Sequence, residues 1–135
     1  MGDEIIFRIR FYTRYPELIG KVLIAIIRAL EFHKRYYPKP ILEIYPPYNK
    51  DEDYYVELTF YEPHSFVWGA KDRAEKIKDE LKRYLSSNEY KKLRLLGIFA
   101  TNIEDPEYEV WLTPTKKGFR MSVETEEGGD SNEQG

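Results

Sequence analysis

Basic and aromatic side chains alternate with apolar ones in a short run near the N-terminus. Within the run Ile5–Tyr12, apolar residues occupy one side of an extended chain. The opposite side carries Arg8, Arg10 and Tyr12. Because strand side chains alternate between the two faces of a sheet, this run predicts a strand with one core face and one cationic face. Guanidinium groups and phenol rings suit contacts with phosphates and stacking on bases.

A second run, Tyr54–Tyr61, has the same two-sided character and contributes more rings. If a hairpin near the C-terminus extends the same sheet, its Trp and Arg side chains join the cationic face, with two lysines at its tip. We expect the arginines to meet phosphates, the rings to stack on bases and the lysines to clamp the strand. The predicted nucleic-acid-binding residues are Arg8, Arg10, Tyr12, Tyr55, Tyr61, Trp111, Lys116, Lys117 and Arg120.

These residues predict sequence-tolerant binding of single-stranded nucleic acid without turnover, with DNA favoured over RNA. The central-strand placement is shared with the RNA-recognition fold in layout only, because the run has no glycine of the RNP1 pattern. Two alternatives stay open. The tyrosines can pack on the hairpin or on a second subunit, and the chain can be a homo-oligomeric interaction or regulatory protein that uses this face or the helix at 16–36.

The residue types that usually carry catalysis or bind metals are sparse. The chain has no cysteine, which excludes disulfides and thiolate chemistry. His33 and His64 are isolated, whereas structural zinc needs four ligands. Glycines form no phosphate-binding loop, and no pair of carboxylates is recognisably placed for acid–base work. We therefore expect no metal, no cofactor and no enzymatic activity.

Charge is distributed unevenly along the 135 residues. The formal net charge is −3, but residues 124–135 hold five acids and no base. Without those acids, 21 basic residues face 19 acidic ones, a net charge of +2. Because the last residues also lack apolar side chains, we expect one domain over 1–124 and a disordered acidic tail over 125–135.

This acidic C-terminus resembles the tails of single-stranded-DNA-binding proteins, including small ones from archaea and their viruses. The resemblance covers about a dozen residues and the general layout, with no signature motif. It implies that the tail recruits a protein partner or competes with DNA for the basic face. The chain departs from the bacterial version because it ends in Glu-Gln-Gly rather than in an apolar tip.

The surrounding pattern predicts the elements that would position the basic face. Their order is β-α-β-β-α-β followed by a hairpin, which matches the ferredoxin-like split βαβ plan with both helices on one face of an antiparallel sheet. The first and third strands are then central. The expected elements are a strand at 4–13, a helix at 16–36, strands at 41–45 and 54–61, a helix at 66–85, a strand at 91–100 and a hairpin of 108–113 and 119–123.

The helix expected at 16–36 is apolar over most of its circumference, which predicts that either another helix or a second subunit covers it. We expect a homodimer. The longest apolar stretch, Val22–Ile27, is far shorter than a membrane span, so we expect a cytoplasmic protein, or one in the host cytoplasm if it is viral. Abundant Lys, Arg and Glu, with no Cys, are typical of hyperthermophiles.

Overall fold

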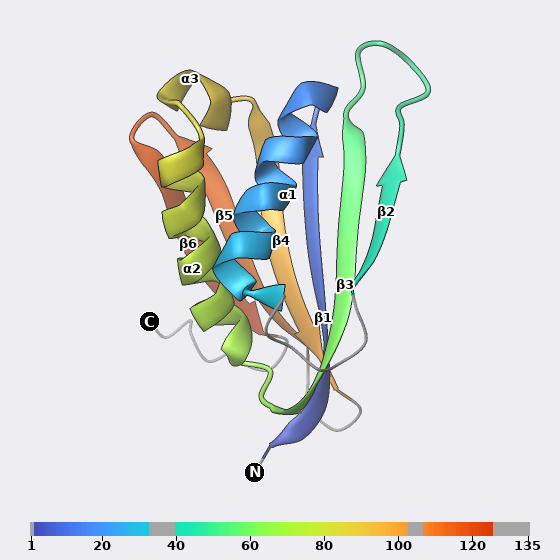
Figure 1. Cartoon of the computed structure of the whole chain (residues 1–135), viewed down its shortest axis with the longest axis vertical. Helices are drawn as coiled ribbons and strands as arrows, with labels where there is room; N and C mark the ends of the chain where they lie inside the picture. The colour runs from blue at the N-terminus through green and yellow to red at the C-terminus, as the bar shows by residue number, and fades with distance from the viewer. Residues whose placement is uncertain (1, 33–39, 103–106, 126–135) are drawn as a thin grey trace.

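The structure is a computed structural model that describes residues 2–32, 40–102 and 107–125 (Figure 1). Six strands and three helices are formed by these described residues. In chain order they are β1 (Asp3–Thr13), α1 (Pro16–Leu30), β2 (Ile41–Tyr45), β3 (Tyr54–Ser65), α2 (Gly69–Tyr84), α3 (Ser87–Tyr90), β4 (Leu93–Thr101), β5 (Tyr108–Thr115) and β6 (Gly118–Thr125).

The strands form one antiparallel sheet in the order β2-β3-β1-β4-β5-β6. Both long helices, α1 and α2, lie on the same side of this sheet (Figure 1), and no helix of the described residues covers the other side, which we call the open face. The prediction of an α+β, ferredoxin-like fold with an added C-terminal hairpin is confirmed. β1 and β3 are adjacent inside the sheet, as expected.

The core lies between the sheet and the two helices. Alternate residues of β1 and β3 point into it, and Phe7 stacks on Phe60 with ring centroids 5.3 Å apart. Each large apolar side chain buried there contributes about 1.5–3 kcal/mol of hydrophobic stabilisation. Side chains with no exposed surface include Ile5, Phe7, Ile9 and Phe11 from β1 and Ala70, Ala74, Ile77 and Leu81 from α2.

Several element ends differ from the predicted ones. α1 ends at Leu30, not near residue 36, because Glu31 adopts a left-handed conformation (φ 53°) that caps the helix. α3 was not predicted; it begins with a capping box in which Ser86 and Glu89 exchange side-chain-to-backbone hydrogen bonds. Residues 33–39 lie outside the described part, as do 126–135, which make up most of the predicted acidic tail; Thr125 ends β6.

None of the helices formed by the described residues combines the length and apolar character needed to cross a bilayer.

Candidate functional site

The open sheet face carries a row of three tyrosine rings that contact one another. Tyr12 on β1, Tyr55 on β3 and Tyr45 on β2 share one cross-strand register. The ring centroids of Tyr12 and Tyr55 lie 5.1 Å apart, and those of Tyr55 and Tyr45 lie 5.4 Å apart. Tyr12 and Tyr55 are therefore partly buried by their neighbours, whereas Tyr45 on the edge strand is exposed.

Arg10, in the middle of this face, has its charge balanced by the neighbouring strand. It lies opposite Glu57 in the β1–β3 register, and Arg10 Nε is 3.4 Å from Glu57 Oε1. The guanidinium also lies over the Phe99 ring, 4.6 Å from its centroid. The Tyr55 hydroxyl donates a hydrogen bond to the same carboxylate. Burial of the phenol, together with this bond, raises the pKa of Tyr55 well above its usual range.

Arg8 and Trp111 are engaged in a similar way. One Arg8 guanidinium nitrogen lies 3.5 Å from Glu107 Oε2 and donates to the Thr101 hydroxyl at 3.3 Å. The Trp111 ring meets the Phe99 ring edge-on at 5.1 Å. It also covers Gly97, where a β-carbon would lie only 2.7 Å from the indole. This packing explains why a glycine occupies the middle of β4.

The remaining predicted residues are not brought into the same cluster. Tyr61 lies near the other end of the face, opposite Ile6, and is partly buried. Arg120 is exposed on the edge strand β6. Lys116 and Lys117 are exposed at the β5–β6 turn, where the Lys116 carbonyl accepts a hydrogen bond from Tyr90 of α3. The structure therefore gathers five of the nine predicted residues: Arg8, Arg10, Tyr12, Tyr55 and Trp111.

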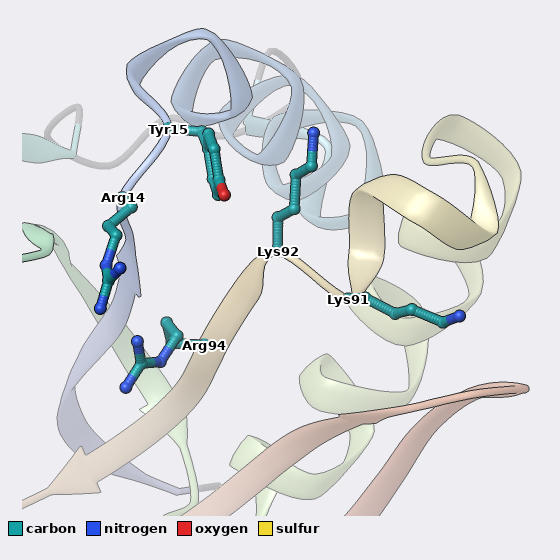
Figure 2. A pocket seen from close by; sticks show the side chains of 5 residues that line it. All are labelled: Arg14, Tyr15, Lys91, Lys92 and Arg94. Carbon is teal, nitrogen blue, oxygen red and sulfur yellow. The ribbon is translucent and has the colours of Figure 1, made fainter.

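A second cationic region, which the sequence patterns did not single out, lies where β1 ends and β4 begins. It is a pocket of about 200 Å³ (Figure 2). Two of its residues follow β1 and three come from the segment that opens β4. The pocket is lined by Arg14, Tyr15, Lys91, Lys92 and Arg94.

Thr13 holds the two segments together. Its side chain is fully buried, and its hydroxyl donates a hydrogen bond to the Lys92 carbonyl at 3.1 Å. The same hydroxyl accepts one from the Tyr15 N–H, also at 3.1 Å. Thr13 is also the last residue of β1 that pairs with β4, opposite Leu93. The backbone that carries the pocket side chains is thus fixed by strand pairing and by a buried hydroxyl.

Within the pocket, the cations outnumber the carboxylate that faces them. Arg14 Nε and an Arg94 guanidinium nitrogen lie 3.9 and 3.8 Å from the same atom, Asp53 Oδ1. Lys92 Nζ lies over the Tyr15 ring, 4.7 Å from its centroid. The Arg94 guanidinium points toward Arg14, whereas Lys91 points away from both (Figure 2). The two arginines therefore form one cationic group that faces Asp53, while Lys92 lines the pocket beside Tyr15 and Lys91 stands at its rim.

Sequence reasoning missed this pocket because its residues are divided between two distant segments. Arg14 and Arg94 are eighty positions apart, and each looks like an ordinary solvated charge. A usable signal was present in the expected topology. Antiparallel neighbours place the end of β1 beside the start of β4, so the cations at 14 and at 91–94 must meet.

Groups of three or more His, Cys, Asp or Glu residues placed to hold a metal ion are not found in the described part of the chain.

No protein-family model and no curated protein matches the chain. A structural match is found with LarC2, the C-terminal domain of a cyclometallase involved in the synthesis of the NPN cofactor of lactate racemase, in its apo form. The match covers 96% of this chain and 85% of that domain, with 10% sequence identity and a TM-score of 0.33. At this level of similarity it assigns no activity to this chain.

The prediction of single-stranded nucleic-acid binding by the open face is corrected here. The geometry of the face gives the physical reason: Arg8 and Arg10 are ion-paired, and the rings of Tyr12 and Tyr55 contact each other in a tilted arrangement. Binding a strand there would first have to break these contacts. The resemblance of the acidic tail to single-stranded-DNA-binding proteins stays a prediction, since residues 126–135 lie outside the described part.

Proposed function

We propose that this protein binds a ligand carrying a multiply charged phosphate group, and that the phosphate lies in the pocket between β1 and β4. The observation that carries the proposal is that Arg14 and Arg94 face the same Asp53 carboxylate, while Lys92 adds a third cation to the pocket lining beside Tyr15. A dianionic or more highly charged group balances the excess of positive charge left in this pocket. A single carboxylate from a ligand does not.

The types of cation favour phosphate further. A guanidinium group presents planar, paired N–H donors that match two phosphate oxygens at once. Arg14 and Arg94 approach each other from two strands, so one phosphate group can receive donors from both. Lys92 adds a point charge held beside the Tyr15 ring. Tyr15 also provides a hydroxyl that can donate to an oxygen at the pocket wall.

The pocket volume limits what enters it. Pockets for drug-sized ligands span about 300–1,000 Å³, whereas this one measures about 200 Å³. A phosphate or diphosphate group fits, and the rest of a larger ligand would lie outside, beyond Lys91. We therefore use pyrophosphate as the first probe and inorganic phosphate as the second.

The test is calorimetric titration of pyrophosphate and of phosphate into the full chain at low salt. We expect pyrophosphate to bind more tightly than phosphate and Arg94→Gln to weaken pyrophosphate binding by about tenfold, the size of one charge-assisted contact. Arg120→Gln is the matched control, because it removes the same charge from an exposed site on β6. Equal affinity in both variants, or no heat from either anion, would rule out the pocket as the binding site.

A second candidate function is homodimerisation through the sheet edge, which we propose from β2. Among the described residues this strand pairs only with β3, so no described strand pairs with the other side of its backbone. Four of its five residues are large hydrophobic residues exposed by 44% or more, and they point to both faces of the sheet. They are Ile41, Leu42, Ile44 and Tyr45. The other edge, β6, carries exposed Arg120 and Glu124, which discourage pairing.

A partner that covers β2 must add a strand with apolar side chains on both faces, and β2 of a second copy has this character. Light scattering after size exclusion tests the idea. We expect a dimer for the natural chain and a monomer for Ile44→Lys, since a charge on an edge strand opposes pairing. Val123→Lys places the same charge on β6 and should stay dimeric. A natural chain that is monomeric at 100-fold the working concentration would refute the proposal.

A further inference from the structure

We infer that the Asp53 carboxylate occupies the phosphate position between Arg14 and Arg94 in the free protein and that the ligand displaces it. Asp53 would thus set which anions the pocket accepts. This inference rests on the proposed function, and it adds a selectivity element from a strand connection that is not among the pocket's lining residues.

Asp53 lies close enough to both arginines to form ion pairs, but too far from them to form hydrogen bonds. Its Oδ1 atom lies 3.9 Å from Arg14 Nε and 3.8 Å from the nearest Arg94 nitrogen. Hydrogen bonds from nitrogen to oxygen are about 2.7–3.2 Å long. The same Oδ1 atom has no surface exposed to solvent and no hydrogen-bond partner among the described residues. Buried polar atoms are nearly always hydrogen-bonded, so this carboxylate is held by charge at an energetic disadvantage.

The arginines, in turn, keep donors for a ligand. A guanidinium has five N–H donors, and the distances to Asp53 leave them outside hydrogen-bond range. A phosphate placed between Arg14 and Arg94 can accept several of these donors at normal length. It thereby replaces one charge contact with charge-assisted hydrogen bonds, which are shorter and stronger.

The position of Asp53 in the chain allows such an exchange without disturbing the sheet. It ends the β2–β3 connection, directly before Tyr54, which is already paired with Thr13 of β1. The connection is closed by its own hydrogen bonds, from the Tyr48 N–H and the Asn49 amide to the Glu52 carboxylate. The Asp53 side chain can therefore rotate away while the backbone on both sides stays in place.

This arrangement makes the pocket selective by charge. A monoanion must compete with a carboxylate of equal charge that is already tethered nearby. A phosphate dianion or a pyrophosphate brings more charge and more acceptor oxygens, and so it displaces Asp53. Displacing Asp53 costs the same free energy whichever anion enters, so removing its charge should strengthen the binding of every anion and bring weakly bound monoanions into the measurable range.

The test compares Asp53→Asn with Asp51→Asn, the same change on an exposed residue of the same connection. We expect Asp53→Asn to bind pyrophosphate roughly three- to tenfold more tightly than the natural chain, as one partly exposed charge contact implies. Asp51→Asn should change the affinity by less than twofold. Acetate, a monoanion, should bind measurably to Asp53→Asn only.

A decrease in affinity in Asp53→Asn would show that Asp53 positions the arginines, and an unchanged affinity would show that it does not occupy the site; either result overturns the inference. Both results are distinct from failure of the proposed function, in which the natural chain and Arg94→Gln do not differ in pyrophosphate binding. If Asp53→Asn does not fold, carbon-13 NMR of the natural chain provides the readout. Displacement predicts that the Asp53 carboxyl signal moves on pyrophosphate titration while the Asp51 signal does not, and a stationary Asp53 signal contradicts it.

Discussion

The open sheet face and the pocket both include residues of β1 or just after it, and both contain arginine and tyrosine. They differ in charge balance: Arg10 on the face has its own carboxylate partner, whereas Arg14 and Arg94 in the pocket share one. On the face, Arg10 lies opposite Glu57 in the strand register, and the ion pair forms because antiparallel pairing places them together. In the pocket, Arg14 lies beyond Thr13, the last residue of β1 that pairs with a described strand. The charge of Arg10 is thus balanced by the strand register, whereas Arg14, just past a strand end, shares a single carboxylate from the β2–β3 connection with Arg94.

The largest expected effect is a contrast between two double variants, one of which should lose pyrophosphate binding while the other should lose stability. Arg14→Gln with Arg94→Gln should weaken pyrophosphate binding by more than about 30-fold, since both guanidinium groups are lost. Arg8→Gln with Arg10→Gln should leave binding within twofold. The latter pair should instead lower the free energy of unfolding by about 1 kcal/mol, because it leaves Glu57 and Glu107 without their ion-pair partners.

Calorimetric titration and urea unfolding of the same two proteins check this comparison. Loss of pyrophosphate binding in the Arg8/Arg10 variant at unchanged stability would move the functional site to the open face. Equal destabilisation of both variants would show that the pocket arginines are structural.

The next largest effect concerns stability, through the packing of Trp111 and Phe99 over Gly97 on the open face. In Gly97→Ala the new β-carbon would lie 2.7 Å from the Trp111 ring and 2.8 Å from the Phe99 ring. Because these rings pack on each other, we expect a loss of about 1–3 kcal/mol in the free energy of unfolding. Gly20→Ala is the control, since nothing lies within 4 Å of its β-carbon in α1 and the helix should gain about 0.5–1 kcal/mol. Thermal melts of both variants measure the difference, and an unchanged melting temperature in Gly97→Ala would mean that Trp111 is free to move away.

The two regions also show how much could be predicted from the sequence. Alternation in β1 correctly separated the buried Ile5, Phe7, Ile9 and Phe11 from the face that carries Arg8 and Arg10. It could not predict that Glu57 would lie opposite Arg10, because a register shifted by two residues keeps the same faces but changes every partner. The predicted face of β1 was therefore confirmed, whereas the ion pairs that engage its arginines could not be predicted from the pattern.

The end of α1 illustrates a different limit. The usual signal for a helix C-terminus is a glycine, which adopts the left-handed conformation without strain. Here Glu31 adopts it with φ 53°, and the nearest sequence signal, Pro38, lies further along the chain. Nothing in the local sequence distinguishes this glutamate from those inside a helix, so the predicted end was too late.

The smallest expected effect is the pH dependence of the face, carried by Tyr55. Burial and the hydrogen bond to Glu57 raise its pKa in the folded state. Since the unfolded value is about 10, the protonated phenol stabilises the fold fully below about pH 10, and this contribution is lost as the pH rises through the folded-state pKa. Tyr45 and Tyr108 have pKa values raised in the same direction, by repulsion from Glu43 and by burial respectively, so only a comparison isolates Tyr55.

Tyr55→Phe provides that comparison, because it keeps the ring in contact with Tyr12 and removes only the hydroxyl. Between pH 9 and pH 11, the melting temperature of the natural chain should fall further than that of Tyr55→Phe, by about 2 °C, a small value because Tyr55 is only partly buried. Pyrophosphate binding at pH 8 should be the same in both proteins, since the phenol lies on the face and not in the pocket. Parallel melting curves over this pH range would show that the Tyr55–Glu57 bond adds nothing to stability, and the face would then be held by its ring contacts and ion pairs alone.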